Sequence, residues 1–307
     1  MKTHNSKIIP ESGNTPLLKA NILEKKVGIN SIYIKLEQNN PTHTHKDRAA
    51  SMIVNKAKEK RFRGVTIGTC GNFGVSVAYF CSLYGLKSHL FIPSSYDMPR
   101  LKKMQSYGAN IEFIEGTYED TVEASARYAK VNEYFDANPH GEGAEIAIEG
   151  YKKIAHEIVK DLGNISLLVW VPVGNGTLLT GIYLGLLEKK VKFTLGAVSS
   201  KGNNEITESY IQKRRICLKG SDLKETHINE PLLNWLPTQL EESLQALRSL
   251  NGYAYGATDT ELISASDIIK SSEGITTIPS SAAGLAGLLK YKNKLPNLIT
   301  HVLILTN

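Results

Sequence analysis

The sequence has few cysteines, and no apolar run in it is long enough to cross a bilayer. Cys70, Cys81 and Cys217 are the three cysteines, and their wide spacing favours neither a disulfide framework nor a zinc site. The longest apolar runs, such as 166–173, are too short for a transmembrane helix and are typical of buried strands. No basic and apolar leader with a cleavage site is present at the N-terminus, so we expect a cytoplasmic protein without a membrane partner.

No concentrated block of positive charge accompanies the net charge of +6. The basic residues are dispersed in short groups, such as 56–63 and 213–215, which fall where amphipathic helices are expected. Nucleic-acid binding requires a basic face with aromatic side chains or a known module, and the sequence shows neither. We therefore interpret these groups as solvated helix faces and expect no nucleic-acid partner.

Internal repeats and low-complexity linkers are also absent, and short β-rich runs alternate with helical stretches. This alternation predicts an α/β fold with parallel-rich sheets flanked by helices, and the length of 307 residues favours two domains. In such folds, ligands bind beyond the carboxyl ends of the strands. The expected strands are 31–36, 65–69, 89–93, 110–114, 167–173, 193–198 and 301–305, and the expected helices are 47–60, 75–84, 99–107, 119–130, 150–161, 177–189 and 260–272.

A lysine stands between a loop and a helix in the segment 40–48, which reads N-P-T-H-T-H-K-D-R. The positive end of a helix dipole and partly buried backbone both favour the neutral form of Lys46, which Schiff-base chemistry requires. On this segment alone, a solvated first-turn lysine beside Asp47 is the alternative interpretation.

Two glycine-containing turns each follow an expected strand and open an expected helix. The first, 69–74, offers backbone N–H groups and small side chains that suit a carboxylate. The second, 172–177, lets the backbone approach a phosphate closely. It matches neither the P-loop nor the dinucleotide pattern, because it lacks the Gly-Lys-Ser/Thr ending and has Leu179 in place of a third glycine. Taken singly, each turn is also compatible with an ordinary strand-to-helix connection.

Together and in this order, these motifs resemble the fold-type II family of enzymes that depend on pyridoxal phosphate (PLP), within the tryptophan synthase beta-like superfamily. The pattern is most similar to the threonine synthases, through the V-P-V-G-N-G loop and the ending 304–306. The resemblance covers nearly the whole chain. It rests on the start 13–17, on Lys35 and Glu37 ahead of 40–48, on Gly71 and Asn72, and on 107–109, 273–275 and 279–283.

The resemblance implies a role for each matching residue. Lys46 would hold PLP as a Schiff base and later move the substrate's protons, while Asn72 would hydrogen-bond the ring hydroxyl. The cofactor phosphate would be bound by Gly174, Asn175, Gly176 and Thr177. Thr306 would meet the pyridine nitrogen with a neutral hydroxyl. Thr69, Cys70, Gly71, Asn72 and Phe73 would take the substrate carboxylate.

The resemblance also implies a domain arrangement. A large PLP-binding domain would contain 1–48 and 136–307, a small mobile domain would contain 49–135, and the active site would lie between them. We also expect a small amino-acid substrate and a homodimer.

The sequence departs from the family near the expected chemistry. His43 and His45 replace a glycine and an aromatic residue before Lys46, and His140 follows Asn138-Pro139 where an arginine that grips substrate phosphate is usual. These histidines either pack structurally or help to bind an anionic substrate group, and His43, His45 and His140 are therefore candidate substrate residues. A metal site is not expected, because no third ligand stands at a suitable spacing.

Three functions remain open from the sequence. The first is a lyase of threonine synthase type, which eliminates phosphate from O-phosphohomoserine or a related phosphorylated amino acid and adds water. The second is a β-replacement synthase or an ammonia-lyase acting on serine, threonine or an activated serine. The third is a non-catalytic binder of a phosphate ligand that uses the loop at Gly174.

Overall fold

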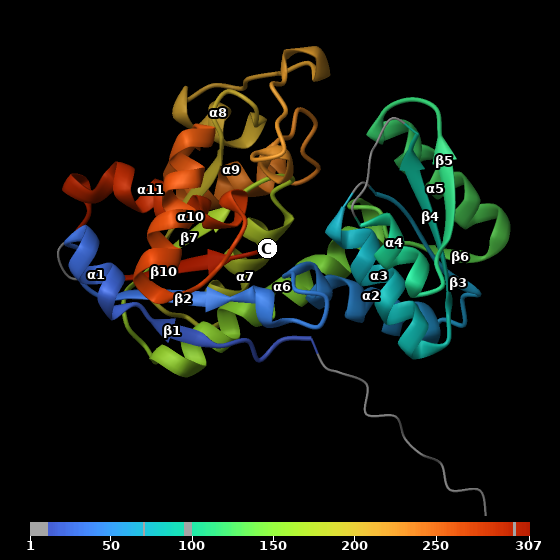
Figure 1. The fold of residues 1–307 in the computed structure, drawn as a ribbon, viewed down its shortest axis with the longest axis horizontal. Helices are drawn as coiled ribbons and strands as arrows, with labels where there is room; N and C mark the ends of the chain where they lie inside the picture. The colour runs from blue at the N-terminus through green and yellow to red at the C-terminus, as the bar shows by residue number, and fades with distance from the viewer. Residues whose placement is uncertain (1–11, 70, 95–99, 297–298) are drawn as a thin grey trace, which may run out of the picture. The chain divides into compact units, whose positions relative to one another are not determined.

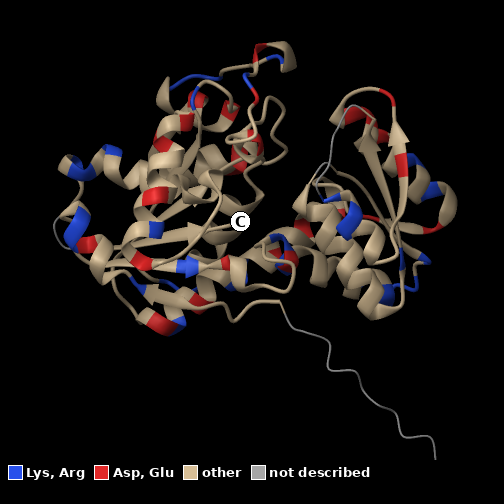
Figure 2. Ribbon diagram, viewed as in Figure 1, with Lys and Arg blue, Asp and Glu red and all other residues tan. Residues whose placement is uncertain are grey.

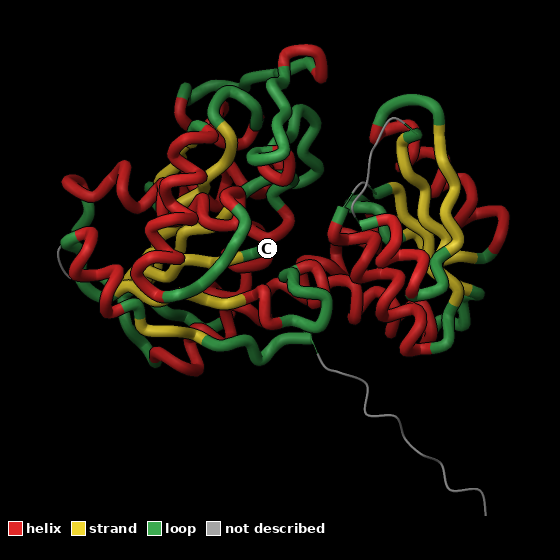
Figure 3. The backbone as a smooth tube through the Cα atoms, in the orientation of Figure 1, coloured by secondary structure: helices red, strands yellow, loops and turns green. Residues whose placement is uncertain are grey.

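The computed structural model describes residues 12–69, 71–94, 100–296 and 299–307. Contacts divide these residues into two compact units (Figure 1). The first contains Asn40–Ala147 with Ser12 and Gly13, and the second contains Asn14–Asn39 and Ile148–Asn307. The predicted small domain, 49–135, falls within the first unit, which also includes 40–48 and 136–147. Strands lie between helices in both units, and the predicted α/β class is confirmed (Figure 3).

The second unit is built on a six-stranded sheet in the order β1-β2-β10-β7-β8-β9. All neighbouring strands are parallel except β1 and β2. Every residue of β7 and β10 is buried, which explains why β7 and residues 302–305 of β10 are apolar without alternation. The strands are β1 (Leu17–Lys19), β2 (Ile32–Leu36), β7 (Leu167–Pro172), β8 (Phe193–Ser200), β9 (Tyr253–Ala257) and β10 (Thr300–Leu305).

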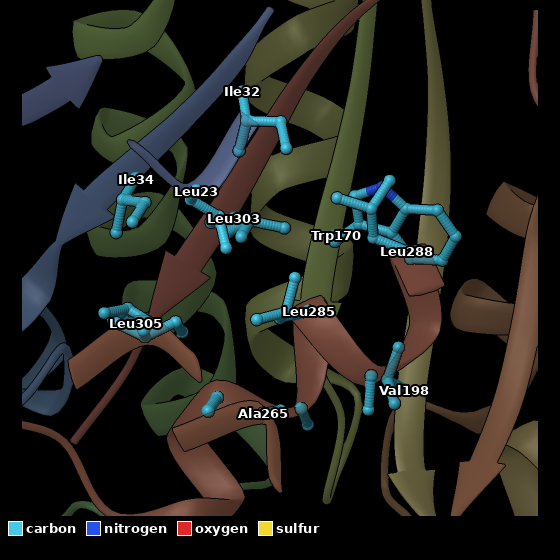
Figure 4. Packing of buried hydrophobic residues seen from close by; sticks show 14 of the residues in the cluster. Leu23, Ile32, Ile34, Trp170, Val198, Ala265, Leu285, Leu288, Leu303 and Leu305 are labelled. Atoms are coloured by element: carbon cyan, nitrogen blue, oxygen red, sulfur yellow. The ribbon is translucent and has the colours of Figure 1, made fainter. Parts of the chain in front are cut away.

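Helices α1, α10 and α11 share one apolar cluster with the strands of this sheet (Figure 4). Helix α7 packs against β7 and β8, and α9 packs against β8. The helices are α1 (Asn21–Val27), α6 (Gly141–Leu162, which begins in the first unit), α7 (Thr177–Glu188), α8 (Glu205–Ile211), α9 (Leu240–Ser249), α10 (Asp259–Glu273) and α11 (Ala283–Tyr291), with short 3-10 turns at Glu37–Asn39, Gly220–Asp222, Glu230–Leu232, Pro279–Ala282 and Lys292–Lys294.

Trp170 of β7 is the largest fully buried side chain in this cluster. A Cβ atom on Gly196 of β8 or on Gly287 of α11 would collide with its ring. Its indole Nε1 has no hydrogen-bond partner among the described residues. The two glycines therefore leave the room that the indole fills, and close packing rather than a polar contact fixes the ring.

The first unit is built on an all-parallel sheet in the order β5-β4-β3-β6. Its strands are β3 (Gly64–Gly68), β4 (Lys87–Pro93), β5 (Asn110–Ile114) and β6 (Tyr134–Asp136). Helices α2 (Lys46–Glu59) and α3 (Asn72–Tyr84) pack against each other and share a core with β3, β4 and α4 (Leu101–Ser106). Helix α5 (Tyr118–Asn132) packs against β3, β4 and β6, and a capping box between Thr117 and Asp120 fixes its start.

All seven predicted strands and all seven predicted helices are present among the described residues, with shifts at some ends. The largest shift is at α6, which begins at Gly141 rather than at 150. The sequence reading missed the three-residue strands β1 and β6, the strand β9, and the helices α1, α8, α9 and α11. Acidic and basic residues are interspersed along both units (Figure 2), and no helix of the described residues is long and apolar enough to cross a membrane.

His301 of β10 is buried, and its Nδ1 has no partner among the described residues. Burial lowers the pKa of His301 from 6.5 to about 4, because the charged ring would lose its hydration. Between these two values the unfolded chain binds a proton that the folded chain does not. We therefore expect the free energy of unfolding to fall by about 2 kcal/mol between pH 7 and pH 5 because of this group.

The measurement is urea unfolding of the apoprotein at pH 7 and pH 5. His301→Leu should flatten this part of the pH dependence, whereas His227→Asn, at an exposed position, should keep it. An unchanged pH dependence in His301→Leu would show that other groups cause the acid sensitivity.

Candidate active site

The lysine segment lies in the first unit, and α2 begins at Lys46 itself. The next residue, Asp47, is fully buried and accepts hydrogen bonds from the Thr42 N–H at 2.6 Å and from the Thr42 hydroxyl at 2.5 Å. Burial raises the pKa of Asp47, and hydrogen bonds from Ser76 and Thr42 oppose this shift. The carboxyl group thus folds the loop back over the first turn of α2 and sets the position from which Lys46 projects.

The two histidines of this loop have different surroundings. His43 is exposed and has φ of +69°, a left-handed conformation that favours glycine. His43 therefore occupies a turn position that a glycine would adopt more easily. His45 immediately precedes α2, with Nδ1 3.5 Å from the Thr44 hydroxyl. His140 is 47% exposed, and its Nε2 lies 3.9 Å from Asp136 Oδ2.

The turn after β3 leads into α3, which begins at Asn72. The Thr69 hydroxyl accepts from the N–H groups of Gly71 and Gly74 and so holds the turn closed. Cys70 lies outside the described residues. Ser76 connects this turn to the lysine loop. Its hydroxyl donates to the Asn72 carbonyl at 3.0 Å, and its Oγ lies 3.1 Å from Thr42 Oγ1. The first unit therefore brings the starts of α2 and α3, and with them Lys46 and Asn72, to neighbouring positions.

Arg100 lies beside the same turn and was missed from the sequence. A Cβ atom on Gly71 would lie 3.5 Å from Arg100 Nη1. Arg100 immediately precedes α4, and Met104 of that helix packs against Gly74. A guanidinium group beside a candidate carboxylate turn is suited to an anion. No pattern in the sequence connects position 100 with position 71, because only the packing of α4 on the turn brings them together.

The glycine loop at 173–177 lies in the second unit, between β7 and α7. All four carbonyl oxygens of 173–176 accept hydrogen bonds from the protein. Asn204 Nδ2 donates to Val173 O and Gly174 O, the Gln239 N–H donates to Asn175 O, and the Thr180 N–H donates to Gly176 O. Because C=O and the following N–H point to opposite sides of a trans peptide, the N–H groups of 174–177 face away from these partners. They lie at the start of a twelve-residue helix, where N–H groups have no acceptor within the helix.

Gly176 is essential to this conformation, with φ of +89°. A Cβ atom there would lie 2.5 Å from Ser243 Oγ and 2.9 Å from Gln239 O. The Asn175 side chain supports the loop, since Oδ1 accepts from the Thr238 N–H at 2.7 Å and Nδ2 donates to the Thr238 hydroxyl at 2.8 Å. The loop fits a phosphate group that binds to its main chain, and the side chain of Asn175 is used for bracing.

Thr306 directly follows β10, the neighbour of β7. Leu303 pairs with Trp170, so the same register brings Thr306 level with Val173, the first residue of the glycine loop. The next residue, Asn307, is held by the Ser281 hydroxyl, which accepts from its N–H at 2.9 Å, and by Thr277, which donates to its Oδ1 at 2.7 Å. The second unit therefore brings Thr306 and the glycine loop together at one edge of the sheet.

Lys35 is also buried, but it is held by other groups. Its Nζ lies 2.7 Å from Glu157 Oε2 and donates to Thr15 O at 2.6 Å. These contacts fix the loop that precedes β1. Lys35 is therefore structural, and Lys46 remains the candidate for a covalent bond to the cofactor.

We expect sodium borohydride to reduce PLP onto Lys46, because this lysine begins a helix next to the buried Asp47. Peptide mapping of the reduced enzyme should find the pyridoxyl group on Lys46. Lys46→Ala should lose the label, the visible absorbance and turnover, whereas Lys58→Ala, at an exposed position of the same helix, should keep all three. A label on Lys35 or another lysine would contradict this assignment.

Gly176→Ala should weaken PLP binding at least about 10-fold, because the added Cβ collides with α9 and displaces the N–H groups of the loop. Gly163→Ala is the matched control, since Gly163 also has positive φ, +75°, but meets nothing within 4 Å. The measurements are titration of the apoenzyme with PLP and thermal unfolding without it. Equal PLP affinity in the two variants would show that the loop has another role.

Comparison with known proteins agrees with this geometry. Residues 8–307 match the family described as pyridoxal-phosphate dependent enzyme. A threonine synthase of Synechocystis sp. is 30% identical over 96% of this chain and 76% of that protein. A threonine synthase of Methanocaldococcus jannaschii is 30% identical over 91% of this chain and 69% of that protein.

Solved structures share the fold at lower identity. Threonine deaminase isoform 2 from Solanum lycopersicum has a TM-score of 0.81 at 19% identity, with 95% of this chain and 78% of that chain covered. Maize serine racemase has a TM-score of 0.81 at 20% identity, with 96% and 89% covered. The fold-type II architecture, the family match and the phosphate-fitting loop agree, and the chain belongs to the pyridoxal-phosphate dependent enzymes.

Proposed function

We propose that this enzyme is a lyase of threonine synthase type, which eliminates phosphate from O-phosphohomoserine or a related phosphorylated amino acid and adds water. Threonine synthases at 28–30% identity, covering 91–96% of this chain, support the reaction type. The structural observation that carries the proposal is Arg100, whose guanidinium lies beside the turn at Gly71. It supplies a cation for a substrate phosphate, although the arginine usual in the family after Asn138-Pro139 is replaced by His140.

Different residues of the chain have different roles in the proposed reaction. When bound, PLP supplies an electron sink that makes hydrogens near the amino-bearing carbon of the substrate removable. Lys46 Nζ takes and returns those protons. The turn at 69–73 binds the substrate carboxylate at the start of α3, where helix N–H groups have no acceptor within the helix. Arg100 holds the phosphate, which leaves with the electron pair of its C–O bond, and water then supplies the new hydroxyl.

The cofactor contacts belong to the same proposal. The N–H groups of 174–177 bind its phosphate, Asn72 meets its ring hydroxyl, and Thr306 meets its pyridine nitrogen. A threonine hydroxyl is neutral and does not hold that nitrogen fully protonated, which suits elimination and replacement chemistry. His43, His45 and His140 remain candidate substrate residues, and the homodimer and the cytoplasmic location remain predictions.

The direct test compares O-phosphohomoserine, O-phosphoserine, serine and threonine as substrates. We expect the highest kcat/KM for O-phosphohomoserine, with equal amounts of phosphate and threonine formed. Ammonia and a 2-oxo acid from serine or threonine, without phosphate release from either phosphorylated substrate, would instead support an ammonia-lyase. A protein without visible cofactor absorbance after incubation with PLP would support a non-catalytic binder.

Arg100→Ala extends this test to the substrate site. Because charge-assisted hydrogen bonds contribute about 1.5–3 kcal/mol, its KM for O-phosphohomoserine and O-phosphoserine should rise about 10-fold or more, whereas its KM for serine should change little. Lys102→Ala removes an exposed cation from the same helix and should change none of these values. An equal loss for serine and O-phosphoserine, which share the carboxylate, would assign Arg100 to the carboxylate or to the turn.

A further inference from the structure

Asn204 is a fully buried polar residue between β8 and α8, and it was not among the predicted site residues. Its Oδ1 accepts from the Ile206 N–H at 3.0 Å and caps α8. Its Nδ2 donates to Gly174 O at 2.8 Å, to Leu232 O at 3.1 Å and to Val173 O at 3.3 Å. One amide group thus joins the start of α8, the segment at Leu232 and the glycine loop.

The carbonyls that Asn204 binds determine where two N–H groups of the loop point. The peptide between Val173 and Gly174 contains Val173 O and the Gly174 N–H, and the next peptide contains Gly174 O and the Asn175 N–H. In each trans peptide these groups lie on opposite sides. Holding both oxygens toward Asn204 therefore turns both N–H groups to the side opposite Asn204.

The carbonyls of the rest of the loop accept hydrogen bonds from other residues. The Gln239 N–H donates to Asn175 O, and the Thr180 N–H of α7 donates to Gly176 O. Asn203, one residue before Asn204, is also buried, but its amide contacts Ser200 and Lys224 rather than the loop. Asn203 is therefore a buried asparagine beside Asn204 that does not contact the loop, and it is a suitable control.

We propose that Asn204 is a positioning residue for the cofactor phosphate, and that it orients the N–H groups of Gly174 and Asn175 before the cofactor binds. This inference rests on the placement of the phosphate at the Gly174 loop. It assigns Asn204 an effect on phosphate affinity through the backbone, without contact to the cofactor. Preorganised donors bind more tightly because less conformational entropy is lost on binding.

The test uses Asn204→Ser, which keeps a hydroxyl able to cap α8 but removes the amide donor. Apoenzyme is titrated with PLP and with pyridoxal, which has the same ring and aldehyde but no phosphate. We expect the Kd for PLP to rise about 10- to 100-fold in Asn204→Ser and the Kd for pyridoxal to change less than about 3-fold. Asn203→Ser should leave the ratio of the two Kd values as in the wild type.

An equal weakening of both ligands, or an unchanged ratio, would overturn the inference and leave Asn204 with a purely structural role. If Asn204→Ser does not fold, Asn204→Asp keeps the shape and the cap and should change the ratio in the same direction. A wild-type enzyme that binds PLP no more tightly than pyridoxal would contradict both this inference and the cofactor site. A wild type with the expected ratio that releases no phosphate from O-phosphohomoserine would contradict the proposed reaction alone.

Discussion

Parallel strand pairing is the constraint on which the candidate site depends. In a parallel sheet all strands end at one edge, so the turns that follow them, and the helices that those turns open, begin side by side. In the second unit this places the turn after β7, the turn after β8 and the residue after β10 in one row. Asn204 can reach the carbonyls of the glycine loop because β8 is the neighbour of β7.

In each peptide of the glycine loop, the C=O group and the N–H group have different roles. Its carbonyl oxygens bind the protein. In the proposed site, the N–H groups on the other side of each peptide bind the phosphate. Such a site holds a phosphate with partial charges in a fixed arrangement, so it selects by shape and distance as well as by charge. The full positive charge that the proposed chemistry uses for the substrate phosphate comes instead from Arg100, which immediately precedes α4 in the first unit.

The sequence predicted the features that local patterns encode. Alternating strands and helices predicted the fold class, and the motifs around Lys46 and Gly174 correctly fell at helix starts. The sequence did not reveal Arg100, Ser243 or Asn204, because each acts on a residue at least 29 positions away through tertiary packing. It also missed α8 and α9, because these two helices follow each other without a strand between them. Their positions depend on buried polar contacts of the intervening segment, such as the hydrogen bond from Asn204 Nδ2 to Leu232 O.

The glycine-walled pocket of Trp170 gives the protein an internal spectroscopic reporter. The chain has two tryptophans, and Trp170 is fully buried while Trp235 is partly exposed. An indole in apolar surroundings without a hydrogen-bond partner emits at shorter wavelength than one in contact with water. Because Trp170 lies on the strand that leads into the glycine loop, a bound chromophore whose absorption overlaps the indole emission would quench that emission by energy transfer. Blue fluorescence would then report the integrity of this core, and its quenching would report the occupancy of the loop.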